Sequence, residues 1–358
     1  MVIEQYTVTQ RYNFPQPSMD TSLPQRFVEQ SIHSLRQVRN QPFQLNQQTI
    51  QQDSLYENIP MTLQLKRTPL ALTPRMQETL IAAVDTSTIK IGETSTGIII
   101  AVRGANVWKQ NRAYRYKRLG PFIFHITEDN KKDVFKALEK SYFSTQYGTS
   151  HQSTPNLLQM PMRLASLLER WLQAMIAKVA TNGVLLFDGS LTSGTIDTPV
   201  QRMREILSTA RRNGNTVLAF SKATSLRSNG YLITDLLPER DPPYLLETTG
   251  LRFKPPIILL GDVYVARLNK ANLAFRLDID REIPTQDRME ALERLIGNDV
   301  FQQSYPETLR LAHILCTFTA NEVLAIQHFI TRKHGIQIIS RPDMHRLLFG
   351  SFGREGYA

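Results

Sequence analysis

The fold is decided by the stretch Gly183-Val184-Leu185-Leu186-Phe187-Asp188-Gly189-Ser190-Leu191. Its four consecutive apolar residues, 184–187, predict a strand that is buried on both faces of an α/β sheet. The run stops at an aspartate, and Gly189 permits the sharp turn that follows. Ligands of open α/β sheets bind beyond the carboxyl ends of the strands, so Asp188 is a candidate site residue. An Asp-Gly pair is also an ordinary turn signal, and this stretch alone leaves both interpretations open.

A second apolar run also ends at an aspartate. Residues 80–84 read Leu-Ile-Ala-Ala-Val, and Asp85 follows them directly. An isolated charge buried in a sheet is costly, and a divalent cation offsets that cost. Two aspartates that end two core strands therefore indicate a shared metal site.

Size and composition are those of a globular protein. The 358 residues are 41% hydrophobic and suffice for one large domain or two moderate ones. Uninterrupted apolar runs are shorter than the ~18 residues that a membrane helix needs, and the first residues lack a signal-peptide layout. A single cysteine, Cys316, excludes an internal disulfide framework and a thiolate metal cluster. We therefore expect a soluble, cytoplasmic protein without a membrane partner.

The charge balance favours a polyanionic partner. The net charge is +10, and no acidic residue occurs between positions 94 and 127. Within this span, cations alternate with aromatic residues, a pattern that suits phosphates and unpaired bases, although a run of charges is also typical of a solvated face. We predict that Arg112, Arg115 and Lys117 contact nucleic acid. The cations of the segment are Arg103, Lys109, Arg112, Arg115, Lys117 and Arg118, and its aromatic residues are Trp108, Tyr114 and Tyr116.

The order of the expected elements follows from hydrophobic periodicity and turn signals. Residues 1–60 form a polar arm with one short amphipathic helix that begins at Ser22, followed by a glutamine-rich segment. We expect irregular chain over 129–156. Strands are predicted at 80–85, 96–102, 121–126, 184–188, 216–220, 256–260, 263–268 and 273–279, and helices at 160–180, 199–213, 288–296 and from 306 onward.

One acidic residue interrupts the apolar face of the predicted helix 160–180. Glu169 lies in line with Ala165, Leu172 and Ile176 at helical spacing. A carboxylate on a buried face needs a partner, and that partner is either a structural arginine or a metal ion.

A histidine occupies a similar position in the last major helix, which begins after Tyr305-Pro306. His313 shares an apolar stripe with Leu309 and Cys316. A histidine on such a stripe is more often a core residue than a ligand, and spacing alone leaves both roles open.

The succession of three strands, a helix, a strand, a helix and a strand is the order of a ribonuclease H-like sheet. We therefore predict an α/β fold in which helices flank a mixed ribonuclease H-like sheet, with a polar N-terminal arm and C-terminal helices. The acids lie on the first strand, on a helix and at the end of the fourth strand. Two hard cations held by oxygen ligands can clamp the attacking and leaving oxygens of a phosphodiester.

Four motifs in this order resemble those of the NurA nucleases, over about residues 78–320. The resemblance implies a metal-dependent DNA nuclease that uses Mn2+, or Mg2+, in a two-metal mechanism. It implies 5′-to-3′ exonuclease and single-strand endonuclease activities in DNA end processing and repair. It also implies a homodimer and a partner of the HerA type, a hexameric ATPase or helicase. The motifs are Val84-Asp85-Thr86-Ser87, Leu186-Phe187-Asp188-Gly189-Ser190-Leu191, Phe220-Ser221-Lys222, and Tyr305-Pro306 with Ala312-His313.

The same resemblance assigns roles to individual residues. Asp85, Glu169 and Asp188 match the family's acidic metal ligands, and Tyr305 and His313 match its C-terminal active-site pair, with His313 also a metal ligand. Lys222 is expected to hold a phosphate of the DNA. The first motif reads Asp-Thr-Ser, where family members often have Asp-Gly-Ser. The domains implied are an arm over 1–60, a nuclease domain over 61–335 and a tail over 336–358.

Two other functions stay open on the sequence. An actin-like phosphotransferase also begins with an aspartate on a strand, but it needs a glycine-rich phosphate loop, for which Asp188-Gly189-Ser190 is a poor substitute. A non-catalytic DNA-binding or regulatory subunit with the same fold would have no need of Asp85, Glu169, Asp188 and His313 together. A cleavage assay with and without manganese separates the enzyme from the binding protein.

Overall fold

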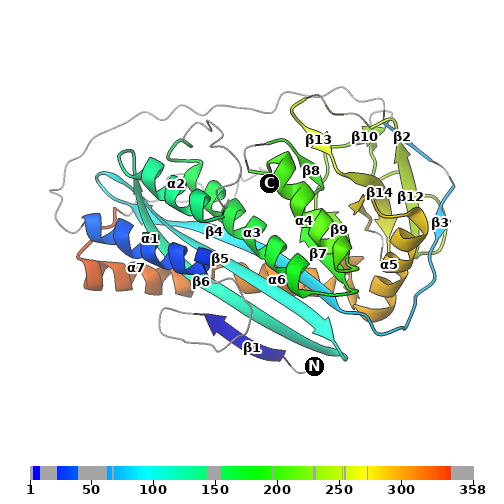
Figure 1. Cartoon of the computed structure of the whole chain (residues 1–358), viewed down its shortest axis with the longest axis horizontal. Helices are drawn as coiled ribbons and strands as arrows, with labels where there is room; N and C mark the ends of the chain where they lie inside the picture. The colour runs from blue at the N-terminus through cyan, green and yellow to red at the C-terminus, as the bar shows by residue number, and fades with distance from the viewer. Residues whose placement is uncertain are drawn as a thin grey trace, which may run out of the picture.

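One mixed sheet of eleven strands runs through the chain (Figure 1). The computed structural model describes residues 3–8, 22–38, 63–142 and 155–339, except positions 67, 196, 229, 230, 252, 254 and 272. In spatial order the strands are β1 (Ile3–Val8), β6 (Ala113–Thr127), β5 (Gly97–Gln110), β4 (Ile81–Glu93), β7 (Val184–Asp188), β9 (Thr216–Ser221), β15 (Phe275–Asp280), β14 (Gly261–Arg267), β12 (Tyr244–Thr249) and β2 (Gln64–Leu65), with β3 (Leu70–Ala71) also paired to β12.

The central five strands have the ribonuclease H-like arrangement. In spatial order β6-β5-β4-β7-β9, they are the third, second, first, fourth and fifth strands of the core. Strand β5 is antiparallel to both of its neighbours, whereas β4, β7 and β9 are parallel. The predicted fold class is therefore confirmed. Strand β1 adds to one edge in parallel, and β15, β14 and β12 extend the sheet antiparallel beyond β9.

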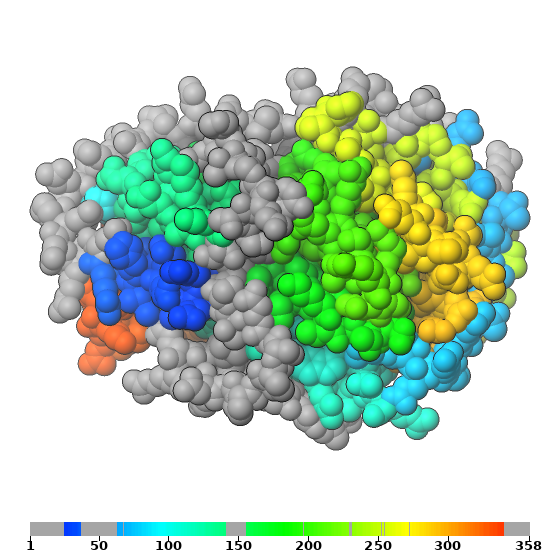
Figure 2. Space-filling view, in the orientation of Figure 1, coloured from blue at the N-terminus to red at the C-terminus, as the bar shows by residue number. Residues whose placement is uncertain are grey.

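Helices cover both faces of the sheet, which explains why β7 is apolar throughout its interior. Figure 2 shows the helices coloured blue to green spread over the face that carries α1 to α4. The helices of this face are α1 (Ser22–Val38), α2 (Lys131–Tyr142), α3 (Met160–Val179) and α4 (Val200–Arg212), and those of the other face are α5 (Thr285–Asn298), α6 (Glu307–Cys316) and α7 (Ala320–His334). Three short two-stranded sheets complete the described elements: β8 (Thr192–Ser193) with β13 (Ile258–Leu259), β10 (Arg227–Ser228) with β11 (Tyr231–Leu232), and β16 (Phe301–Gln302) with β17 (Tyr305–Pro306).

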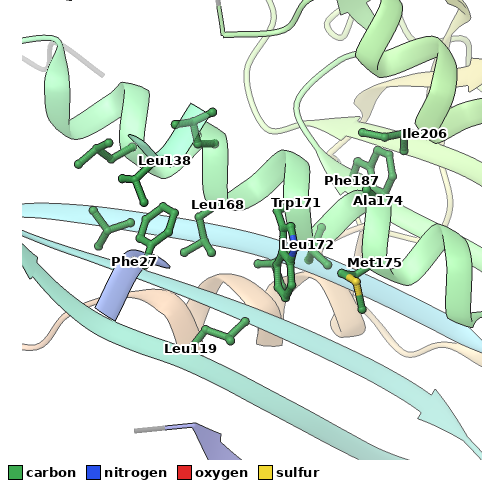
Figure 3. Packing of buried hydrophobic residues seen from close by; sticks show 14 of the residues in the cluster. Phe27, Leu119, Leu138, Leu168, Trp171, Leu172, Ala174, Met175, Phe187 and Ile206 are labelled. Carbon is green, nitrogen blue, oxygen red and sulfur yellow. The ribbon is translucent and has the colours of Figure 1, made fainter. Parts of the chain in front are cut away.

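The largest core lies between the sheet and helices α1 to α4. Leu168, Trp171 and Leu172 of α3 point toward the strands in Figure 3, at the spacing of one helical face. From α1, Phe27 is fully buried, and its ring centroid lies 5.1 Å from that of Phe122 on β6. Truncation of such an aromatic side chain to alanine costs about 3–5 kcal/mol. Helix α1 is thus packed onto the sheet.

Several sequence predictions of elements were too short or incomplete. The strands predicted at 96–102 and 121–126 are longer in the structure. They continue through the basic segment, which forms the paired ends of β5 and β6. Its turn is only Asn111-Arg112, with φ values of 52° and 61°, as in the turns that suit two-residue hairpins. Helix α2 occupies part of the segment expected to be irregular. The glutamine-rich segment from 39 onward and the tail from 340 lie outside the described residues, so the domain boundaries stay predictions.

One stretch of the described chain, Glu307–His334, is long and apolar enough to cross a membrane by length and composition alone. The stretch consists of α6 and α7, with the turn 317–319 between them. Leu309 of α6 and Ile330 of α7 are fully buried among residues of the sheet. Part of the apolar character of the stretch thus covers the sheet, although only 28% of its most apolar window is buried.

Candidate active site

Asp85 and Asp188 lie side by side where their strands separate. Strands β4 and β7 pair in parallel up to Val84 opposite Phe187, and each aspartate is the next residue of its strand. Strand β7 ends at Asp188, and Gly189 turns the chain with a φ of 94°. Strand β4 instead continues to Glu93, so the prediction that Asp85 ends its strand is wrong. The two carboxylates nevertheless meet, because the parallel pairing stops there.

His313 approaches this pair from α6. Its Nδ1 lies 2.7 Å from Oδ2 of Asp85, whose other oxygen accepts the backbone N–H of Thr86 at 2.7 Å. Asp85 is 6% exposed, whereas the His313 side chain is 51% exposed. His313 is therefore not a core residue. The packing of α6 is provided by Leu309 and Ala312, and the imidazole lies between Asp85 and solvent.

Asp188 contacts two further predicted site residues. Lys222, just after β9, donates to its Oδ2 at 2.7 Å, and the Tyr305 hydroxyl donates to its Oδ1 at 3.5 Å. The Tyr305 ring is buried edge-on against Phe220 and Phe275. Burial, and then the charges of Asp188 and Asp85, raise the pKa of Tyr305, so its phenol stays protonated and acts as a donor. Tyr305 lies in β17, not in the helix that carries His313.

Glu169 reaches the same region from α3. Its Oε1 accepts a hydrogen bond from Gln173 Nε2 at 3.0 Å and lies 3.5 Å from an Arg170 nitrogen. Burial raises the pKa of Glu169, Arg170 lowers it, and the charges of Asp85 and Asp188 raise it again. The three predicted acids are therefore electrostatically linked, because the charges of Asp85 and Asp188 disfavour ionisation of Glu169.

This set of donors fits a hard divalent cation. The carboxylates of Asp85 and Asp188 are close enough to Glu169 to influence its charge, and Lys222 is the only lysine of the described chain paired with one of the three. Oxygen ligands of this kind are those that Mn2+ and Mg2+ prefer, and a cation would remove the mutual repulsion of Asp85, Glu169 and Asp188. The imidazole of His313 adds a nitrogen ligand that manganese accepts.

Sequence reasoning missed several supporting residues. Gln173, which holds Glu169, is fully buried on α3. Asp278, fully buried and paired with Arg276 at 2.7 Å, accepts the backbone N–H of Leu191 and so anchors the loop after β7. The alternation of charged and apolar residues in Phe275–Asp280 was the available signal. Cys316 is buried beside Asp85 and His313, one helical turn after the histidine.

The predicted DNA-binding arginines and lysine of the basic segment are not brought to the acidic site. Asp85 pairs across the sheet with Ala105, six residues or about 20 Å before the turn that begins at Asn111. Arg115 and Lys117 alternate with two tyrosines that pack on the α6 face, so these two cations point to the other face. The tyrosines belong to the core. Their rings are therefore not available to stack on bases, contrary to the sequence interpretation.

Comparison with known proteins identifies the family. The sequence matches the NurA domain over residues 79–315, a range that includes all five predicted catalytic residues. The chain belongs to the NurA family of nucleases. The resemblance inferred from its motifs is thereby confirmed. No curated protein sequence matches the chain significantly.

Among solved structures, the NurA nuclease from Sulfolobus solfataricus is similar, with 15% identity and a TM-score of 0.44 over 74% of this chain and 88% of that one. Endonuclease V from Bacillus subtilis has 14% identity and a TM-score of 0.33 over 74% of this chain and 88% of that one. The C-terminal lobe of a budding yeast Argonaute has 11% identity and a TM-score of 0.31 over 72% of this chain and 50% of that one.

Proposed function

We propose that this NurA-family protein is a metal-dependent deoxyribonuclease that hydrolyses phosphodiester bonds at the carboxyl end of β7, where β4 and β7 separate. The observation that carries the proposal is the convergence of Asp85, Glu169 and Asp188 with His313. Asp85 holds the half-exposed imidazole of His313, and the charges of Asp85 and Asp188 act on Glu169, although these residues are far apart in the sequence. The three carboxylates outnumber the two cations that pair with them, Lys222 and Arg170.

The residues have separate roles in this proposal. Asp85, Glu169, Asp188 and His313 would hold divalent cations, which when bound would stabilise charge on the attacking and leaving oxygens of the phosphodiester. Asp85 fixes the ring of His313 through Nδ1, which leaves Nε2 as the nitrogen that can either bind a cation or exchange a proton. Lys222, 40% exposed, is a cation that can hold a DNA phosphate, and the Tyr305 hydroxyl orients Asp188.

The family resemblance supports the finer parts of the proposal. Manganese as the preferred ion, 5′-to-3′ exonuclease and single-strand endonuclease activities, a homodimer and a HerA-type ATPase partner in DNA end processing all follow from it. A cytoplasmic location agrees with a DNA substrate. The net charge of +10 favours a polyanion, and the basic segment is a candidate for contacts with DNA beyond the acidic site.

The test is cleavage of end-labelled DNA by the full-length chain. Single-stranded and duplex oligonucleotides labelled at either end are incubated with Mn2+, Mg2+ or excess chelator. We expect cleavage with Mn2+, weaker cleavage with Mg2+ and none with chelator, and the product ladder gives the polarity. DNA binding without cleavage under every metal condition would favour the alternative, a non-catalytic DNA-binding subunit.

A further inference from the structure

A thiol lies beside the imidazole and one carboxylate of the candidate active site. Cys316 follows His313 by one turn of α6, is fully buried, and donates from Sγ to the carbonyl of His313 at 3.2 Å. The ligand atoms of Asp85, His313 and Cys316 all lie within 4.8 Å of one another. The function proposed above gives the thiol no role.

We propose that Asp85, His313 and Cys316 form a binding site for a thiophilic divalent cation such as Zn2+, and that occupancy of this site inhibits the nuclease. The site itself stands on its geometry, whereas the inhibition rests on the proposed function. Zinc bonds of about 2.3 Å to sulfur and 2.0–2.2 Å to nitrogen and oxygen place tetrahedral ligands about 3.4–3.6 Å apart. The separations between the three ligand atoms therefore need to change by about 1.4 Å or less.

The ligand set selects against the ions proposed for catalysis. A thiolate, an imidazole and one carboxylate suit Zn2+, whereas Mn2+ and Mg2+ prefer oxygen ligands. For sites of nitrogen, oxygen and sulfur ligands, Zn2+ also binds more tightly than Mn2+ in the general order of stability. When the ion binds, the proton of Cys316 leaves to solvent, because a coordinated thiol is deprotonated.

The surroundings provide access and an open coordination position. The half-exposed ring of His313 connects the buried thiol to solvent, and three protein ligands leave a fourth position for water. Asp85 would belong both to this set and to the carboxylate cluster. Capture of zinc would therefore withdraw Asp85 and His313 from the cluster that the proposed function requires.

Cobalt is the probe for the site, because Co2+ bound to a thiolate has a sulfur-to-metal charge-transfer band. Cys316 is the single cysteine of the chain, so any such band reports on this residue. We expect one band per chain when chelator-treated, full-length protein is titrated with Co2+, and we expect Zn2+ to displace it. The band should be absent from Cys316→Ser and should need at least about tenfold more Co2+ in His313→Gln.

Two outcomes would overturn the site: absence of the band in the wild-type protein, or a band of unchanged cobalt affinity in His313→Gln, which would mean that the thiol binds cobalt without the imidazole. If Cys316→Ser does not fold, as judged by circular dichroism, the His313→Gln titration alone decides.

For inhibition, micromolar Zn2+ should suppress the Mn2+-supported cleavage, and Cys316→Ser should need at least about tenfold more Zn2+ relative to its own rate. Equal zinc sensitivity in both proteins would overturn the inhibition. A cobalt band without any cleavage would leave the site standing and would reject the proposed function instead.

Discussion

The Nδ1 atom of His313 lies 2.7 Å from Oδ2 of Asp85, although 228 positions separate the two residues. This contact joins α6 on one face of the sheet to the central strand β4. It fixes the plane of an imidazole that is otherwise half exposed, and it adds a side chain capable of acid–base chemistry to a cluster of carboxylates. Two regions that carry separate sequence motifs thereby become one site.

The first prediction is that His313 is required for cleavage. His313→Gln keeps a polar side chain of similar size but cannot take up a proton, so we expect cleavage to fall by about 10²-fold or more, the scale of a positioned acid–base group. The melting temperature should change little, because the ring is half exposed and α6 is packed by other residues. Single-turnover cleavage and thermal unfolding measure the two effects.

The matched control for this variant is His328→Gln on the exposed side of α7. It makes the same chemical change away from the site and should leave both cleavage and melting temperature unaltered. Near wild-type cleavage by His313→Gln would restrict His313 to a structural role.

The central strands and the acids were predictable because local patterns report them directly. Val184–Phe187 is apolar because the strand is covered on both faces, and the aspartate after it is visible as a break in that run. Glu169 was visible as a carboxylate on an apolar helical face. These signals need only neighbouring residues, so a single sequence contains them.

Other features depend on contacts between distant segments. The role of His313 was undecided in the sequence because its stripe on α6 predicts burial. In the structure the imidazole is half exposed and contacts Asp85. The basic segment was predicted to contact nucleic acid because its cations alternate with aromatic residues. Its tyrosines pack inward with a period of two, and Tyr114 donates to the buried Asp299 at 2.8 Å. That partner is 185 positions away in the sequence, so no local pattern predicts the contact.

The second prediction concerns Asp85 and Asp188, the two aspartates where β4 and β7 separate. Asp85→Asn and Asp188→Asn should each reduce cleavage below detection, because an amide is a poor ligand for a hard cation, while DNA affinity stays within a few-fold. Each substitution also removes a charge that raises the pKa of Glu169. In metal-free buffer the melting temperature should therefore stay the same or increase, as at other sites where function opposes stability.

Asp287→Asn, on the exposed surface of α5, is the control for these two variants and should cleave normally. Binding is followed by fluorescence anisotropy and cleavage on gels. Cleavage by Asp85→Asn or by Asp188→Asn at more than a tenth of the wild-type rate would contradict a metal-holding role. Full activity of the wild type in excess chelator would contradict it as well.

The third prediction concerns the basic segment. Replacement of Arg112, Arg115 and Lys117 with alanine should weaken binding of all DNA sequences about equally. The slope of log affinity against log salt should fall by roughly one unit for each lost phosphate contact. The geometry adds a distinction: these residues lie away from the acidic site, so the single-turnover rate at saturating DNA should not change.

A charge-matched control separates local contacts from the loss of net charge. Lys132, Lys136 and Lys140 are exposed on α2, and their triple alanine variant removes the same three charges. If both variants show the same salt slope, only net charge matters, and the basic segment is an ordinary solvated surface.

The fourth prediction concerns an ion pair that holds α7 against the sheet. Arg103, 3% exposed on β5, donates to both oxygens of Glu322, at 2.8 Å and 3.1 Å, and also to the carbonyl of Thr317. Burial alone would raise the pKa of Glu322. Hydrogen bonds from Arg103 and from the Thr319 backbone, with the charges of Arg103 and Arg118, lower it to about 2.

A carboxyl whose pKa is lower in the folded state stabilises the fold above its unfolded pKa, and this contribution is lost as the pH falls toward the folded value. Glu322→Gln should therefore lower the melting temperature by about 2–5 °C at pH 7, since it leaves Arg103 buried without its charge partner. The difference from the wild type should stay constant down to about pH 5 and shrink between about pH 4.5 and 2.

Glu29→Gln, in the exposed pair with Arg26 on α1, is the control and should change the melting temperature by less than about 1 °C. Thermal unfolding at half-unit pH steps measures both variants. A difference for Glu322→Gln that persists undiminished at pH 2.5 would mean that its cost comes from the capping box with Thr319 rather than from the ionised pair with Arg103.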